Sequence, residues 1–133
     1  MIKMTEKITA RDVMIPIKDM ECAEPDEKIA RTEIKILRGG FGSLPVVKDG
    51  VVIGMITQRS ISLASRLHGV GEMKVSDLMT KDLICVESQT PLREVIEILL
   101  KNRIERIPVV EEKKMVGLIT QRKILGAFLD IIS

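Results

Sequence analysis

Apolar positions along this chain follow two different periods, and the change from one to the other occurs twice. Residues 29–37 and 92–100 carry apolar side chains at helical spacing. The segments before them, 19–23 and 82–86, are short and bounded by turn-forming residues, as strands are. The pattern therefore predicts a strand followed by a helix in each half of the chain.

Two further strands are expected after each of these helices. Val46-Val47 and Val51–Ile53 lie on either side of Asp49-Gly50, a dipeptide typical of two-residue β-hairpin turns. In the second half Glu111–Lys114 takes the place of that turn and is a weaker turn signal. Each half therefore contains a predicted β-hairpin.

The pattern returns to helix after Thr57 and after Thr120. The predicted inward stripes of these last helices are Ile61, Ala64 and Leu67, and Ile124, Phe128 and Ile131. A short helical turn is expected around Asp12 and around Asp77 at the start of each half. The predicted fold class is α/β (α+β), built from two βαββα units.

An internal repeat explains why the pattern occurs twice. With a shift of 63 residues, nine of the eighteen paired positions from Leu44 and from Ile107 onward are identical. Upstream, Asp12-Val13-Met14 aligns with Asp77-Leu78-Met79 at a spacing of 65. The repeats are expected to span residues 8–68 and 73–131, with a linker at 69–72.

One repeat is too small to bury much apolar surface, so the two copies are expected to pack together with pseudo-two-fold symmetry.

Composition excludes several functions. With 21 Lys+Arg against 19 Asp+Glu the net charge is only +2, and Trp and Tyr are absent, so nucleic-acid binding is disfavoured. One histidine, His68, and two cysteines 63 residues apart, Cys22 and Cys85, do not form a usual zinc site or a catalytic group.

No segment has the length and hydrophobicity of a membrane span, and the first residues lack a secretory apolar core. We therefore expect a cytoplasmic protein that is not an enzyme, requires no cofactor and contains no metal. Cys22 and Cys85 are expected to be reduced, small hydrophobic residues. His68, next to Gly69, is expected to end a helix.

The repeated residues resemble a known family. The sequence from Pro45-Val46-Val47 to Gly54–Thr57, repeated from Pro108 to Thr120, is similar to the cystathionine-β-synthase (CBS) domain. The resemblance implies a tandem pair, or Bateman module, that binds AMP, ADP, ATP or S-adenosylmethionine in clefts between its repeats. It also implies a homodimer that regulates a separate, unidentified protein.

The resemblance further implies which residues contact the ligand. In each cleft, one repeat supplies the residues before its first helical turn and those just before its strand proline. The other repeat supplies the threonine that precedes its last helix, together with the residue three positions later. The residues implied for one cleft are Thr9, Phe41, Gly42, Ser43, Thr120 and Lys123. Those implied for the other are Lys74, Ile104, Glu105, Arg106, Thr57 and Ser60, with Arg106 near a phosphate.

Two positions depart from the pattern of nucleotide-binding members. An aspartate that accepts hydrogen bonds from both ribose hydroxyls is typical there, but this chain has Ser60 and Lys123. Serine makes at most part of that pair of bonds, and lysine has no acceptor. Losing such bonds weakens binding by roughly ten- to a hundred-fold.

Cations near the helix starts point toward an anion. Arg59 and Arg122 fall in the first turns of the predicted final helices, where the helix dipole disfavours positive charge, and Lys123 adds a further cation. A bound phosphate would resolve this conflict. The alternative is that these side chains extend into solvent or pair with surface acids such as Glu24 and Glu87.

Three function classes remain open. The first is a regulatory module that binds an adenosine-containing ligand. The second is a ligand-free dimerisation or scaffold module for an enzyme or transporter, which the missing aspartates favour. The third, nucleic-acid binding, has only the mild basic excess in its support.

Overall fold

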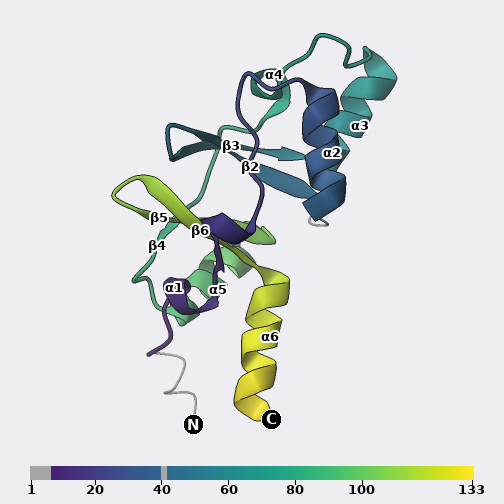
Figure 1. Ribbon diagram of the computed structural model, residues 1–133. Coiled ribbons are helices and arrows are strands. Elements are labelled where there is room, and N and C mark those ends of the chain that lie inside the picture. The colour runs from purple at the N-terminus through teal and green to yellow at the C-terminus, as the bar shows by residue number, and fades with distance from the viewer. Residues whose placement is uncertain (1–6, 40–41) are drawn as a thin grey trace. The chain divides into compact units, whose positions relative to one another are not determined.

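The computed structural model describes residues 7–39 and 42–133, and the chain divides into two compact units (Figure 1). Met20–Leu83 forms one of them, which we call the continuous unit. The chain up to Asp19 combines with Ile84–Ser133 to form the other, the split unit. We call the first residues of each sequence repeat, 8–19 and 73–83, its leading stretch. The leading stretch of each repeat thus belongs to the unit that contains the helices and hairpin of the other repeat.

The elements follow the order expected from the repeat. In the continuous unit they are α2 (Ile29–Gly39), β2 (Ser43–Lys48), β3 (Val51–Thr57), α3 (Gln58–Leu67) and α4 (Val75–Leu78). In the split unit they are α1 (Ala10–Val13), β1 (Ile15–Pro16), the 3-10 turn η2 (Ile17–Asp19), β4 (Val86–Glu87), α5 (Leu92–Asn102), β5 (Arg106–Glu111), β6 (Lys114–Thr120) and α6 (Gln121–Ile132). The mixed α/β fold of two repeats is confirmed.

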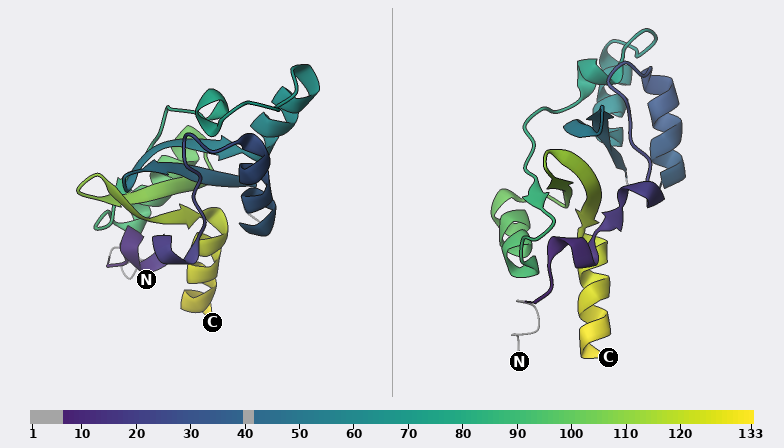
Figure 2. Two further views of the ribbon diagram at one scale, coloured as in Figure 1. Left: turned by 45° about the horizontal axis from the view of Figure 1, so that its top comes forward. Right: turned by 60° about the vertical axis from the view of Figure 1, so that its left-hand side comes forward.

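The strands of the split unit pair in the order β4-β5-β6-β1. β4 is parallel to β5, with Val86 opposite Val109, and β5 is antiparallel to β6. β1 adds to the other side of β6, with Ile15 opposite Leu118. The leading stretch of the first repeat therefore completes the sheet of the second (Figure 2).

The continuous unit repeats this order with shorter outer partners. β2 and β3 form the antiparallel hairpin, and single bridges at Ala23 and Thr80 flank it. The strand expected at 19–23 is therefore wrong except at Ala23, because Ile17–Asp19 turns as a 3-10 helix and Pro25, which has no N–H, follows closely. The strand expected at 82–86 begins only at its last residue, Val86.

The two hairpins have the same turn despite different sequences. Asp49 and Gly50 both have positive φ angles, of 52° and 82°, as the Asp-Gly signal predicts. Glu112 and Lys113 adopt the same conformation, with φ angles of 49° and 71°. The second hairpin thus forces two non-glycine residues into the left-handed region.

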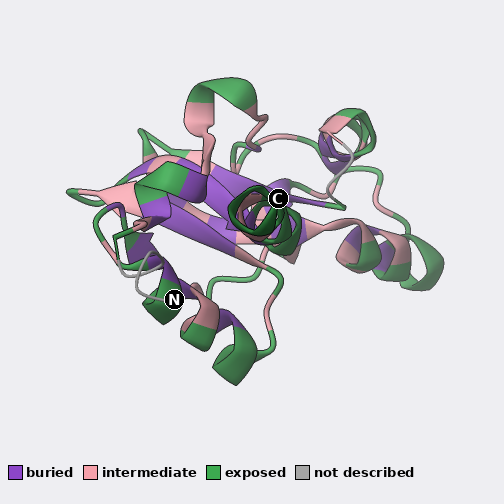
Figure 3. Cartoon of the chain, turned by 90° about the horizontal axis from the view of Figure 1, so that it is seen from below, coloured by how far each residue is buried: buried purple, intermediate pink, exposed green. Residues whose placement is uncertain are grey.

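Each unit has its own hydrophobic core, in which the strands are the most buried elements (Figure 3). Ile61 and Ala64 of α3 and Ile124 of α6 are buried as expected. Leu67 and Ile131 were expected on the same stripes but are 65% and 37% exposed. Both lie in the last turns of their helices, and the inward stripe predicted there is wrong.

A close backbone approach fixes each leading stretch to its neighbouring strand. A Cβ at Gly54 of β3 would lie 2.7 Å from Met79 Sδ and 2.8 Å from Thr80 O. The equivalent position, Gly117 of β6, would place it 2.5 Å from Met14 Sδ. Glycine at these two positions is therefore required by packing rather than by backbone angles.

In the ranges 7–39 and 42–133, every helix falls short of the length and hydrophobicity that a membrane crossing demands.

Candidate functional site

Threonine caps the last helix of each repeat. Thr57 and Thr120 have extended backbones at the ends of β3 and β6 and stand as N-caps of α3 and α6. Thr57 Oγ1 accepts a hydrogen bond of 3.1 Å from Ser60 N, and Thr120 Oγ1 accepts one of 3.1 Å from Lys123 N. Each cap satisfies one backbone donor of the helix start and fixes where the following residues project.

The strand starts lie opposite these caps. Ser43 of β2 pairs with Thr57, and Arg106 of β5 pairs with Thr120. Directly opposed residues of an antiparallel pair project from the same face, so each side chain lies on the face of the capping threonine. Ser43 is only 2% exposed, and its hydroxyl has no hydrogen-bond partner among the described residues.

The residues just before β2 and β5 accept backbone hydrogen bonds from the first residues of α3 and α6. Gln58 N donates to Gly42 O over 2.9 Å, and Gln121 N donates to Glu105 O over 3.1 Å. Gln58 also donates through Nε2 to Glu33 Oε2, while its Oε1 is buried without a partner in the described part of the chain. Gln58 was not among the expected site residues, although its identity with Gln121 in the repeat was a signal for it.

The leading residues Thr9 and Lys74 each precede a fully buried residue. Ala10, next to Thr9, belongs to the core cluster that contains Ile119 and Ile124, the neighbours of Thr120 and Lys123. Val75, next to Lys74, belongs to the cluster that contains Ile56 and Ile61, the neighbours of Thr57 and Ser60. The latter cluster lies in the continuous unit. The core of each unit therefore contains the residue that follows Thr9 or Lys74, together with residues at the start of α6 or α3.

The cations at the helix starts are open to solvent. Arg59, Arg122 and Lys123 are exposed, and none of them forms an ion pair with another residue of the described ranges. Of the expected alternative, the extension of these side chains into solvent is found, whereas pairs with Glu24 or Glu87 are not found in these ranges. Arg106 is more buried, with a side chain 28% exposed and Nη1 3.8 Å from Glu105 Oε2.

The two helix starts differ in chemistry at the third helical residue. Ser60 Oγ lies 2.8 Å from Thr57 Oγ1, so its hydroxyl is already engaged but retains acceptor capacity. Lys123 offers only donors there. The continuous unit therefore keeps a neutral acceptor at this position, whereas the split unit has a cation there, directly after Arg122.

The expected site residues are divided between the units. Gly42, Ser43, Thr57, Ser60 and Lys74 belong to the continuous unit, and Thr9, Ile104, Glu105, Arg106, Thr120 and Lys123 to the split unit. Phe41 lies outside the described residues. Each expected cleft combines residues of both units, so its assembly stays a prediction.

The cysteines carry no metal-site geometry. Cys22 and Cys85 are both free and half-buried, and among the described residues no group of three or more His, Cys, Asp or Glu side chains could hold a metal ion. Burial raises the pKa of both thiols. Lys35 partly offsets this rise in pKa at Cys22, whereas Glu87 adds to it at Cys85. His68 caps the end of α3, as expected.

Known proteins match nearly the whole chain. It is 31% identical over 125 residues to an inosine-5′-monophosphate dehydrogenase of Thermoplasma acidophilum, covering 93% of this chain but 24% of that enzyme. It is 28% identical over 96 residues to the CBS domain-containing protein YhcV of Bacillus subtilis strain 168, covering 71% of this chain and 69% of the relative. The chain thus spans only a minor part of the dehydrogenase.

A solved structure has the same fold. The crystal structure of CBSX2 in complex with AMP superimposes with a TM-score of 0.82 at 24% identity, over 94% of this chain and 98% of that one. Residues 10–66 and 75–130 each match the CBS domain. With both repeats matched in sequence and the fold reproduced, this chain belongs to the CBS domain family as a tandem CBS pair.

Proposed function

We propose that this chain is a regulatory module that binds an adenosine-containing ligand, AMP, ADP, ATP or S-adenosylmethionine, in clefts between its CBS repeats. Occupancy would act on a separate partner by favouring one arrangement of the repeats over another, because a ligand shifts an equilibrium only through its different affinities for two states. We place this activity in the cytoplasm. The proposal assigns the chain no catalytic step.

The observation that carries the proposal is the arrangement at the start of α3. Thr57 caps the helix, and the Ser60 hydroxyl lies 2.8 Å from the Thr57 hydroxyl and retains acceptor capacity. Lys74, expected in the same cleft, adjoins Val75, which shares a core cluster with Ile56 and Ile61 next to these two residues. A sugar hydroxyl of a ligand would donate a hydrogen bond to Ser60 at this position.

The relationship to CBSX2 adds support, because that protein was crystallised with AMP. The chemistry of the two helix starts suggests how the parts of such a ligand are recognised. In one cleft Ser60 provides an acceptor for a sugar hydroxyl and Arg106 provides charge for phosphate, whereas in the other Arg122 and Lys123 provide charge but no acceptor. We therefore expect the cleft that contains Ser60 and Arg106 to bind more tightly than the cleft that contains Lys123.

Calorimetric titration of the purified chain with each of the four ligands tests this proposal. We expect saturable heat with at least one of them, and a melting temperature that rises with the concentration of that ligand. Adenosine without phosphate is the matched control for the role of the cations and should bind more weakly than the nucleotides. The absence of heat and of a thermal shift with all four would refute ligand sensing.

Ser60→Asp probes the position at which this chain departs from nucleotide-binding relatives. A carboxylate there accepts from both ribose hydroxyls, so we expect affinity for AMP to rise about ten- to a hundred-fold. Ser65→Asp places the same charge at an exposed position later in α3 and should leave the affinity unchanged. Equal effects of the two substitutions would show that only net charge matters.

A second candidate function is a dimerisation scaffold, and the exposed apolar residues favour it. Large apolar side chains that are at least 56% exposed are Ile34, Leu37, Leu63, Leu67, Leu100, Leu125, Leu129 and Ile132. On α6, Leu125, Leu129 and Ile132 form one stripe at helical spacing. Such a stripe suits a second copy of this chain, so we propose a homodimer with or without a ligand.

Sedimentation velocity, combined with the ligand titrations, distinguishes the two candidates. Leu129→Glu places a charge in the α6 stripe and should shift the chain toward monomer, whereas Asp130→Lys, on the polar face of the same helix, should not. A dimer that binds none of the four ligands would favour the scaffold. A wild-type monomer, or a dimer unaffected by Leu129→Glu, would refute this interface.

A further inference from the structure

A nearly buried ion pair joins α2 to the loop before it in the continuous unit. Lys35 Nζ lies 2.6 Å from Glu27 Oε1, and the side chains of Lys35 and Glu27 are only 18% and 7% exposed. Thr32 Oγ1 donates to the other carboxylate oxygen of Glu27 over 2.6 Å, and Lys35 also donates to Cys22 O over 3.0 Å. Both ends of the loop from Cys22 to Glu27 are thus tied to α2.

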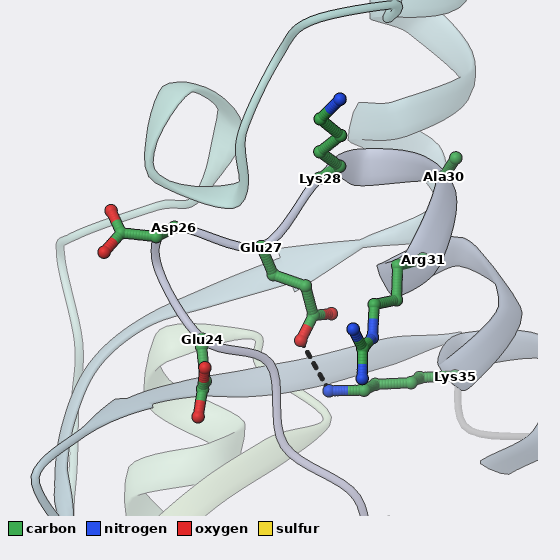
Figure 4. Close-up of a pocket in the computed structure, with 7 residues that line it drawn as sticks. All are labelled: Glu24, Asp26, Glu27, Lys28, Ala30, Arg31 and Lys35. Carbon is green, nitrogen blue, oxygen red and sulfur yellow. Dashed lines mark hydrogen bonds and ion pairs between the residues drawn. The ribbon is translucent and has the colours of Figure 1, made fainter.

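This pair lines one side of an open hollow of about 600 Å³ (Figure 4). Lys35 and Arg31 extend from α2 toward Glu27, whereas Asp26 and Lys28 point away from it. The Glu27 carboxylate is therefore held by the Lys35 ammonium on one oxygen and by the Thr32 hydroxyl on the other. A charge held in this way has a single favourable position, and the main chain of Glu27 is fixed with it.

The fixed main chain carries the leading stretch of the second repeat. Val75 N donates to Glu27 O over 2.9 Å, and Ser76 N donates to Pro25 O over 3.0 Å. Ile29 N donates to Met73 O over 3.2 Å. Lys74, an expected ligand contact, is therefore flanked by residues whose backbone bonds run to this loop and to the first residue of α2.

The first repeat's leading stretch is held by the same backbone pattern without the charges. Ala10 N donates to Thr90 O, and Arg11 N donates to Ser88 O. The positions equivalent to Glu27, Thr32 and Lys35 are Thr90, Val95 and Ile98. Val95 is fully buried and Ile98 packs against the core, so apolar contacts anchor that loop.

We propose that the Glu27–Lys35 ion pair is a positioning device that holds the Lys74 segment beside the start of α3. The proposal rests on the proposed function only for its effect on ligand binding. Val75 shares a core cluster with Ile56 and Ile61, which adjoin Thr57 and Ser60, so a shift of this segment changes the surroundings of that helix start. The split unit, which lacks the ion pair, is unaffected.

Amide hydrogen exchange of the ligand-free full chain tests the positioning directly. Glu27→Gln keeps the shape of the side chain but removes its charge, and should speed exchange at Val75 and Ser76 by about tenfold or more. Exchange at Ala10 and Arg11, the equivalent amides of the split unit, should not change. Equal acceleration at all four amides, or none at any, would overturn the proposal.

Two further variants separate positioning from folding. Glu97→Gln removes one partner of the exposed Arg93–Glu97 pair and should leave all four amides unchanged. The triple variant Glu27→Thr, Thr32→Val, Lys35→Ile transfers the apolar anchor of the second repeat and should restore slow exchange at Val75 and Ser76. If the triple variant exchanges as fast as Glu27→Gln, the apolar contacts of the second repeat do not replace the ion pair. Fast exchange at Val75 and Ser76 in Glu97→Gln as well would overturn the proposal.

Titration with AMP tests the part of this proposal that depends on the proposed function, namely the effect on ligand binding. Glu27→Gln should weaken AMP binding about tenfold at the site that contains Lys74, and the triple variant should recover wild-type affinity. Wild-type affinity in Glu27→Gln would overturn the role in binding. If the wild-type chain binds no AMP, the proposed function fails for this ligand, whereas the exchange rates at Val75 and Ser76 still decide the positioning role.

Discussion

Lys113 occupies a backbone conformation that favours glycine. Its φ angle is 71°, and the equivalent residue of the first hairpin is Gly50, with a φ angle of 82°. Left-handed backbone costs a non-glycine residue about 1 kcal/mol. We therefore expect Lys113→Gly to raise the free energy of unfolding by up to about 1 kcal/mol in a urea titration, and the converse change, Gly50→Lys, to lower it similarly. A loss of stability in Lys113→Gly would mean that contacts of this side chain outweigh the strain.

The two thiols provide a test of local electrostatics. Burial raises the pKa of Cys22 and of Cys85, so both should react with iodoacetamide at pH 8 more slowly than a free thiol, and faster as the pH rises further. Folded thiols that keep their protons above the unfolded pKa also reduce stability as the pH rises past that value.

Lys35 lowers the pKa of Cys22, against the larger effect of burial. Lys35→Met should therefore slow alkylation of Cys22 at a fixed pH and leave Cys85, the control within the same molecule, unchanged. Faster reaction of Cys22 in this variant, measured by mass spectrometry of the labelled peptides, would mean that loosening of the loop outweighs the charge.

At the scale of elements, Gly54 and Gly117 are two positions where packing leaves no room for a side chain. A Cβ at Gly117 would lie 2.6 Å from Ile15 O, a backbone atom that cannot move without the leading stretch. We expect Gly117→Ala to lower the free energy of unfolding by about 1–3 kcal/mol. Gly126→Ala in α6, where the new Cβ meets nothing within 4 Å, should instead raise it by about 1 kcal/mol. Thermal or urea unfolding that gave the same sign for both would contradict this explanation.

Elements with a strong local signal could be predicted from the sequence. The helices at 29–37 and 92–100, the Asp49-Gly50 hairpin and the helix starts after Thr57 and Thr120 all depend on residues near one another in the chain, and the structure contains each of them. The strand at 19–23 failed because the chain turns as a 3-10 helix at Ile17–Asp19 and meets Pro25 soon after Ala23. β1 at Ile15–Pro16 was missed because its pairing depends on a distant residue, Leu118.

The candidate site was only partly predictable. The repeat located Thr57 and Thr120, and the resemblance added Ser43, Arg106 and Ser60. The isolated Ser43 hydroxyl and the Glu27–Lys35 pair depend on burial and on contacts across the unit, which no local pattern encodes.

At the scale of the whole molecule, the boundaries of the compact units differ from those of the sequence repeats. Met20–Leu83 is continuous and contains Val75, which is fully buried, whereas the repeat at 8–68 lacks it. We therefore expect a fragment of residues 20–83 to be more helical by circular dichroism, and to melt more cooperatively, than a fragment of residues 8–68. The two are similar in length, so chain length does not explain a difference. Greater order in 8–68 would mean that the repeat, not the compact unit, is the folding unit.

The insertion of the continuous unit into the split unit also sets an order of events during synthesis. All residues of the continuous unit have been made once Leu83 leaves the ribosome, but the split unit must wait for the chain beyond Ile84. Its contacts, such as Arg11 with Glu111, join residues 100 positions apart. Residues 7–19 therefore remain without their sheet while the centre of the protein folds, and during that interval a chaperone or a neighbouring nascent chain has access to them.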